Sequence, residues 1–356
     1  MRRKLPDYPV EPFSLCESDV AAQSTSPRTG DVAARPKDDA RYPHAPDVIE
    51  RDTADQGFSR GWGVHFQPSP ACWYDAHVHF SMKKQSSPLQ IEVYQSSMKA
   101  YPVTKAAVIL PMSRSRKAGI SLPAAPAGDL QLAWYLYMDY RNPDPDRLRE
   151  GIRAGIRGIK LHNAMIITDG ADPRCWLSEE WRQVFDLLEQ HRLPVLWHVT
   201  QRLTDSPYTG GKRNLYWETG WKKGVSYTNQ DLLDIFIEVV RKYPGINFIA
   251  AHQLHLGWPH LAALFDTCAN LYTDTSVGCF VREFDALYDP DREWIRSFFI
   301  EYSRRILFGT DFIMPATPSE ASIRRIYDGH IRFIRQLRLP EDVLQLVSHQ
   351  NAERIL

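Results

Sequence analysis

Several features that quickly assign a sequence to a class are scarce in this one. Its 356 residues include only five cysteines, none of them spaced Cys-x-x-Cys, which argues against a disulfide framework or a cysteine zinc site. No segment approaches the roughly 18 consecutive apolar residues of a membrane span. No apolar segment follows the basic N-terminal residues either, so we expect no secretory signal. The cysteines are at positions 16, 72, 175, 268 and 279.

An excess of charge of either sign is also absent. The chain has 43 basic and 43 acidic residues, for a formal net charge of +0. This balance gives no support to a nucleic acid or an anionic membrane as partner, since both would favour a basic face. Hydrophobic residues make up 43% of the chain and charged residues 24%, as in a globular enzyme. We expect a cytoplasmic protein with reduced thiols.

The first 70 residues differ from the rest. They are rich in Pro, Arg, Asp, Ser and Ala and show no sustained period of 2 or 3.6, and the stretch from Gln23 to Asp47 is typical of a linker or tail. Trp62, Val64 and Phe66 alternate, so the end of this region could pack on the following domain. We expect residues 1–70 to be an extension that is partly disordered or packed on that domain.

From residue 71 onward, short apolar segments alternate with amphipathic ones. Near-continuous apolar runs are typical of strands buried on both faces. Helices are predicted to begin after Asp144, Ser178 and Thr228, each a good N-cap residue. Eight strand–helix repeats predict a (β/α)8 TIM barrel over residues 71–356. An open doubly wound sheet would carry a glycine-rich turn after its first strand. The strands are expected near 72–80, 105–112, 132–140, 156–162, 193–199, 246–252, 270–277 and 306–312.

The strongest local motif is the His-x-His of the first predicted strand. Side chains alternate along a strand, so His77 and His79 point the same way and could chelate one cation. His198, His252 and Asp311 end the fifth, sixth and eighth predicted strands, and barrel strands bring such ends together at the site. Three imidazoles and a carboxylate suit zinc, with iron, manganese or cobalt as alternatives.

This pattern resembles that of the amidohydrolase superfamily. The phrase Gly-Ile-Lys-Leu-His at 158–162 and the ending Asn-Ala-Glu-Arg-Ile-Leu at 351–356 are similar to those of its amidohydrolase-2 (amidohydrolase-related) branch. The resemblance covers residues 71–356. It implies that His77, His79, His198 and Asp311 bind a divalent metal and that Asp311 takes a proton from the bound water. It also implies that His252 acts on that water when one ion is bound, or binds the second of two ions.

The fourth predicted strand leaves alternatives open. Lys160 and His162 should share its inward face. By the resemblance, Lys160 could be carboxylated and bridge two metals. It could instead hold a substrate carboxylate as an ammonium, or form a structural ion pair near the barrel bottom. His162 is nearer the strand end, where it could meet substrate or a second metal, or be a satisfied core group.

A long connection follows the fifth predicted strand, from residue 201 to 230. It mixes basic and aromatic residues, which could cover the barrel mouth and bind an unsaturated, carboxylate-bearing substrate. A solvated surface loop or a subunit contact would have the same composition. The candidate substrate contacts are Arg202, Tyr208 and Trp217 in this connection, and Arg282 after the seventh strand.

Three functions are compatible with this sequence. The first is a hydrolase in which metal-activated water attacks an amide, lactone, ester or thioester carbonyl of a small anionic substrate. The second, implied by the resemblance, is a non-oxidative decarboxylase or hydratase of an aromatic or unsaturated acid. The third is a non-catalytic barrel scaffold, which would predict damage to the ligand set. A homodimer is the common outcome for soluble enzymes.

Overall fold

The computed structural model describes residues 69–70, 72–80, 88–110, 119–120, 122, 130–201, 214–255, 258–276, 289–313 and 320–356. The expected N-terminal extension lies almost wholly outside these ranges, as do Arg202, Tyr208 and Arg282. The strands are β1 (Trp73–His79), β2 (Val103–Leu110), β3 (Gln131–Tyr137), β4 (Gly158–His162), β5 (Val195–His198), β6 (Phe248–Ala250), β7 (Leu271–Asp274), β8 (Ile306–Leu307) and β9 (Phe312–Ile313).

The strands form one parallel sheet that closes on itself. Its order runs from β8 through β7 and back along the chain to β1, and β1 then pairs with β9. Because β8 and β9 are separated only by residues 308–311, they are two halves of the predicted eighth strand. That strand pairs with β7 at one end and with β1 at the other. The predicted (β/α)8 barrel is therefore confirmed, with its last strand interrupted where Asp311 lies.

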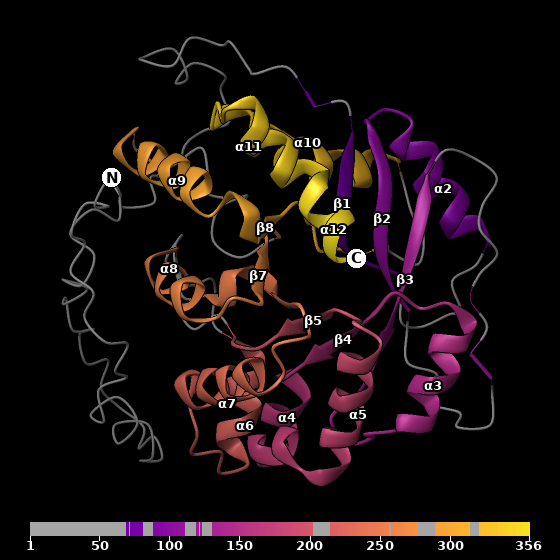
Figure 1. Ribbon diagram of the computed structural model, residues 1–356, viewed down its shortest axis with the longest axis vertical. Helices are drawn as coiled ribbons and strands as arrows, with labels where there is room; N and C mark the ends of the chain where they lie inside the picture. The colour runs from indigo at the N-terminus through magenta and orange to yellow at the C-terminus, as the bar shows by residue number, and fades with distance from the viewer. Residues whose placement is uncertain are drawn as a thin grey trace, which may run out of the picture. The chain divides into compact units, whose positions relative to one another are not determined.

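Helices surround this sheet (Figure 1). Asp144 and Ser178 cap α3 and α5 as predicted, and Thr228 forms a capping box with Asp231 at the start of α7. Within the described ranges, none of the helices is long and apolar enough to span a membrane. The helices are α2 (Pro88–Met98), α3 (Pro145–Ala154), α4 (Ala164–Asp169), α5 (Glu179–Gln190), α6 (Leu215–Lys222), α7 (Asn229–Lys242), α8 (Trp258–Thr267), α9 (Asp289–Glu301), α10 (Glu320–Gln336), α11 (Glu341–Gln345) and α12 (Asn351–Ile355).

The apolar core has two parts. The larger one lies between the outer face of the strands and the helices. The smaller one includes Tyr135, Leu196 and Ile249, which alternate with outward-facing neighbours on their strands and therefore fill the barrel interior. Ala352 and Ile355 of α12 pack against this interior group and close one end of the barrel. The other end is left to polar side chains.

A β-bulge in β1 turns the His-x-His motif inward. Tyr74 and Ala76 belong to the interior apolar group, whereas the later Val78 belongs to the outer one. The register against β2 shifts between Asp75 and Val78, so the inward face changes there from even to odd positions. An extra residue in one strand redirects the side chains that follow it. His77 and His79 therefore point into the barrel together.

Candidate metal centre

The first cluster consists of His77, His79 and Asp311, from β1 and the break between β8 and β9. His77 Nε2 lies 3.0 Å from His79 Nε2, and both nitrogens lie 3.2 Å from Asp311 Oδ1. His77 is fully buried, whereas the Asp311 side chain retains 19% of its exposure. Asp311 has a φ of 51°, a left-handed conformation that only the break in the strand accommodates. Three ligand atoms thus converge on one point.

Lys160 on β4 lies against this cluster. Its Nζ is 3.0 Å from His77 Nε2, and its side chain is 1% exposed. Burial lowers the pKa of Lys160 to about 8, and the carboxylates of Asp311 and Asp274 partly oppose that shift. The lysine is therefore at the candidate centre, with its ammonium form still favoured at neutral pH.

Asp274, at the end of β7, supports the first cluster from behind. Its Oδ2 lies 2.7 Å from His77 Nδ1. Its Oδ1 accepts hydrogen bonds from the backbone N–H groups of His252 and Ser276 and from the Ser276 hydroxyl. Burial alone would raise the pKa of Asp274, but the hydrogen bond and charge of His77 outweigh it and hold that pKa below its usual range. Asp274 is therefore ionised.

The second cluster consists of His198, His252 and His255. Each offers one nitrogen, and the three nitrogens lie within 4.8 Å of one another. His252 was predicted to end the sixth strand. That strand ends at Ala250 instead, and His252 lies on the turn that follows it (η2, Ala251–His255). Residues 252–255 all have positive φ. Residues three apart eclipse in such a tight turn, which stacks the rings of His252 and His255 with centroids 5.1 Å apart.

Burial keeps His198 and His252 of this cluster neutral. It lowers the pKa of His252 to about 4 and holds the pKa of His198 well below its usual value, with further lowering by His162, His252 and His255. His162 stacks on His198, with ring centroids 4.1 Å apart. Neutral rings keep one nitrogen lone pair each, so the second cluster is a source of ligands or proton acceptors.

A further buried carboxylate ties the ends of β1 and β8 together. Asp75 accepts hydrogen bonds from the backbone N–H of Thr310 and from its hydroxyl. It also accepts from the Tyr327 hydroxyl of α10 and from the N–H of His77. Burial raises the pKa of Asp75 to about 6, against the lowering effect of these hydrogen bonds. The network holds His77 and the residue before Asp311 in place.

Residues 74–356 match the family described as Amidohydrolase. The chain belongs to the amidohydrolase family. The match spans the whole barrel, including every residue of both clusters. No curated protein matches the sequence. As an amidohydrolase, the chain is an enzyme of hydrolase or lyase type.

Several solved structures are similar to this amidohydrolase. A probable 2-pyrone-4,6-dicarboxylic acid hydrolase from Acinetobacter baumannii, solved with citric acid bound, is 12% identical, with 80% of this chain and 98% of that one covered and a TM-score of 0.48. 5-Carboxyvanillate decarboxylase from Sphingomonas paucimobilis is 12% identical, with 80% of this chain and 99% of that one covered and a TM-score of 0.48. Dihydroorotase from Campylobacter jejuni is 14% identical, with 80% of this chain and 82% of that one covered and a TM-score of 0.48.

The residues of this amidohydrolase fit a divalent cation. Two ligands bound at 2.0–2.1 Å in tetrahedral geometry lie roughly 3.4 Å apart, and the three atoms of the first cluster are separated by 3.0–3.2 Å. Among the described residues, the buried His198 Nε2 has no hydrogen-bond partner. Imidazole and carboxylate together suit zinc and its neighbours in the transition series. The chemistry of the donor set thus agrees with the family.

Of the predicted substrate contacts, only Trp217 lies within the described residues. It is 2% exposed, and its ring contacts Trp221 and Tyr227. Its neighbour Tyr216 is 41% exposed, and its ring lies 6.3 Å from that of His162. On α6, Tyr216 is therefore the aromatic residue that contacts the fourth-strand histidine.

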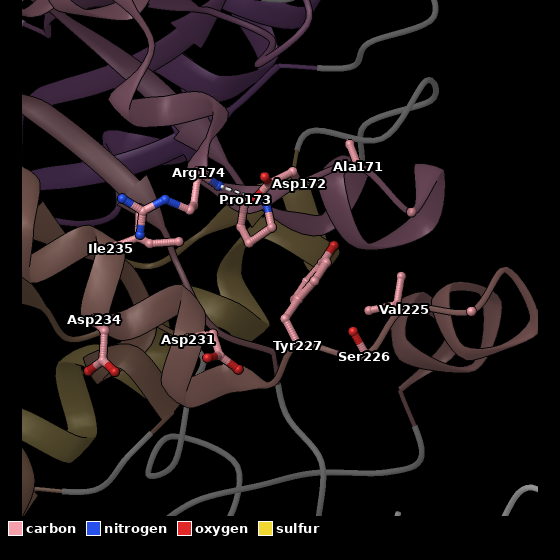
Figure 2. A pocket seen from close by; sticks show the side chains of 12 residues that line it. Ala171, Asp172, Pro173, Arg174, Val225, Ser226, Tyr227, Asp231, Asp234 and Ile235 are labelled. Atoms are coloured by element: carbon pink, nitrogen blue, oxygen red, sulfur yellow. Dashed lines mark hydrogen bonds between the residues drawn. The ribbon is translucent and has the colours of Figure 1, made fainter.

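One pocket of the described residues lies elsewhere on the barrel. It has a volume of about 570 Å³ and is formed around the turn η1 (Pro173–Leu177), the residues before α7 and the first turns of α7. Figure 2 shows Arg174, Asp231 and Asp234 among its lining side chains. No residue that lines this pocket belongs to either cluster, so the pocket is separate from the candidate metal centre.

Sequence reasoning missed Asp274, Ser276 and the role of His255. Asp274 and Ser276 are two positions apart at the end of a strand, the same spacing as the His-x-His motif, and this was the available signal. His255 gave no such signal, because only the left-handed turn brings it beside His252.

Proposed function

We propose that this amidohydrolase is a metal-dependent hydrolase acting on an amide, lactone, ester or thioester carbonyl of a small, carboxylate-bearing substrate. The observation that carries the proposal is the arrangement of the Asp311 carboxylate. Its Oδ1 faces His77 and His79, whereas its Oδ2 lies 3.9 Å from His252 Nε2. One oxygen is thus available to a cation and the other to a proton, which is what activation of a water requires.

The first cluster would hold the ion through His77, His79 and Asp311, and His198 would complete the set. Zinc is the expected ion, with iron, manganese or cobalt as alternatives. When bound, such an ion polarises a carbonyl and lowers the pKa of a water to about 7.

Asp311 and His252 would manage the proton. Burial opposes the ionisation of Asp311, but His77, His252 and His79 outweigh it, so its pKa lies well below the usual range. An ionised Oδ2 would accept a proton from the attacking water and return it to the leaving group. His252, neutral and buried, would orient that water or take the proton in turn.

Lys160 and the mouth of the barrel would bind the anionic part of the substrate. The ammonium of Lys160 is the basic group beside the first cluster, and His162 lies next to the second. Arg202, Tyr208, Trp217 and Arg282 stay predictions as further substrate contacts. Lys160 as a carboxylated bridge between two ions is the alternative use of the same side chain.

The test combines metal analysis with a substrate screen. The purified protein is assayed for bound metal, then offered lactones, esters, thioesters, amides and aromatic acids before and after treatment with a chelator. Chelator-sensitive hydrolysis supports the proposal. Chelator-sensitive release of carbon dioxide, or hydration of an unsaturated acid, assigns the same site to a lyase. A protein that binds no metal and converts none of these classes is a scaffold.

A further inference from the structure

The hydrogen bonds around Asp274 leave little freedom in how protons are placed. The carboxylate is fully buried, and three donors already point at one of its two oxygens, so it acts as an acceptor. Its Oδ1 is occupied by the N–H of His252 at 3.0 Å, the N–H of Ser276 at 3.2 Å and the Ser276 hydroxyl at 2.6 Å. Its Oδ2 faces His77 Nδ1 at 2.7 Å. The nitrogen at that position must therefore carry a hydrogen.

We infer that Asp274 is a positioning residue that fixes the tautomers of two imidazoles at once, those of His77 and His252. For His77 the argument is direct. A hydrogen on Nδ1, donated to Asp274 Oδ2, leaves the lone pair on Nε2. That nitrogen is the one that faces His79 and Asp311. The ring is thereby set as a ligand toward the first cluster.

For His252 the same carboxylate acts through Ser276. A serine hydroxyl has one hydrogen, and the short contact of 2.6 Å gives it to Asp274 Oδ1. Toward His252 Nδ1, at 3.0 Å, the Ser276 oxygen can then only accept. His252 Nδ1 therefore carries a hydrogen as well, and its Nε2 directs a lone pair toward Asp311 Oδ2. One carboxylate on β7 thus orders rings that belong to β1 and to the turn after β6.

Asp274 and His77 pack closely against Gly309. A Cβ atom on Gly309 of the neighbouring strand would lie 2.9 Å from the Asp274 Cβ and 3.3 Å from the His77 Cβ. The two side chains therefore meet in space that only glycine leaves open.

The substitution Asp274→Asn tests the inference because it keeps the size of the side chain. The amide of asparagine places its NH₂ group in one of two positions. It faces either His77 Nδ1 or the three groups that donate hydrogen bonds to Oδ1 in the wild type. The first arrangement forces the hydrogen of His77 onto Nε2, and the second removes three hydrogen bonds. We expect the zinc Kd, measured by competition with a chromophoric chelator, to weaken by about 10- to 100-fold. This consequence for affinity rests on the proposed function.

Thr273→Val is the matched control. Thr273 is buried on the same strand, and its hydroxyl donates to the Ala250 carbonyl at 2.7 Å, so the variant also loses a buried hydrogen bond. We expect its zinc Kd to equal that of the wild type. Equal weakening in both variants would show that any damage to β7 suffices, and would overturn the inference.

The decisive readout needs no metal. Long-range ¹H–¹⁵N spectra of the metal-free protein with ¹⁵N-labelled histidine rings report the tautomer of each ring, with His77 and His252 assigned from spectra of their glutamine variants. We expect Nδ1–H for both rings in the wild type. Ser276→Ala should change His252 alone, and Asp274→Asn should change the tautomer of at least one of the two rings. An Nε2–H tautomer of His77 in the wild type overturns the inference, whether or not the variants fold. A wild type that has the expected tautomers but binds no zinc would instead overturn the proposed function.

Discussion

The two clusters at the barrel mouth differ in charge. The first cluster contains a carboxylate and lies beside a lysine, whereas the second consists of three imidazoles and has no carboxylate. A buried cation is stable when an anionic ligand compensates its charge, and neutral lone pairs alone compensate less. The first cluster is therefore the better cation site. The second is better suited to accept a proton or to complete a coordination sphere.

The clusters also differ in how the backbone holds them. His77 and His79 are on a strand paired on both sides, and the Asp75 network fixes the strand ends around them. His252 and His255 are on a turn of consecutive left-handed residues, a conformation that costs roughly 1–2 kcal/mol per residue for L-amino acids. A hydrogen bond to β7 holds that turn at its start, donated by the N–H of His252 to the Asp274 carboxylate. The first cluster therefore has one left-handed residue, Asp311, beside a paired strand, whereas the second depends on a turn of consecutive left-handed residues.

The largest effect is expected from His77→Ala. The variant removes the one fully buried ligand of the first cluster, which lies close to both other ligand atoms, so it should lose its metal. Turnover should fall by more than the roughly 10²–10⁴-fold expected for a lone acid–base group. Metal content, circular dichroism and turnover are measured together. A folded variant that kept full metal occupancy would remove the distinction drawn between the clusters.

Asp311→Asn should have the next largest effect. The amide keeps one oxygen ligand but cannot hold the proton, so the metal is retained, more weakly, and turnover falls by about 10²–10⁴-fold. Single-turnover rates across pH are compared with metal content. If the variant holds its metal and reacts within about tenfold of the wild type at every pH, the proton acceptor belongs to the second cluster. His252 would then be the first residue to test.

His255→Ala should have a smaller effect than either. It removes one of three imidazoles from a cluster without a carboxylate, so the tightly bound ion should stay and turnover should fall less than in Asp311→Asn. Metal stoichiometry at increasing zinc concentration gives the answer. Loss of the tight ion in this variant, with the first cluster intact, would reverse the ranking of the two sites.

The smallest effect concerns His330 on α10, which lies behind the first cluster against Phe308. Burial lowers the pKa of His330 to about 4, so it adds no positive charge there at neutral pH. Its pKa in the unfolded chain is about 6.5, so stability is lost as the pH falls below that value toward 4. This group alone should cost about 2 kcal/mol of unfolding free energy between pH 7 and pH 5.

Urea unfolding of the wild type and His330→Leu at both pH values measures that loss. The leucine variant should show a pH dependence smaller by this amount. An equal dependence in the two proteins would mean that His330 is already charged in the folded state. Its positive charge would then partly compensate the negative charge of Asp311, and the contrast in charge between the clusters would weaken.

Local patterns carried most of what the sequence predicts correctly. The strands follow from short apolar runs, and the helix starts at Asp144, Ser178 and Thr228 follow from side-chain caps. The shared direction of His77 and His79 follows from strand geometry alone. Each of these depends on residues close together in the chain, so a single sequence is enough to predict it.

The features that depend on distant residues were not predictable in this way. The bulge in β1 depends on the register against β2, and the contact of Asp274 with His77 joins residues 197 positions apart. The left-handed turn that places His255 has no glycine to announce it. The early end of the sixth strand was missed as well, because the apolar pattern of the strand continues into that turn.

The pairing of β1 with β9 also has a consequence for the order in which the molecule is made. Asp75 and Thr310 form hydrogen bonds where these two strands close the barrel, and they are 235 positions apart in the chain. At about 5–20 residues per second, synthesis separates them by on the order of 10–50 s. During that interval the two histidines of β1 have left the ribosome without the aspartate that faces them. Contacts of such long range form late in folding, so this enzyme completes its candidate metal centre in the same event that closes its barrel.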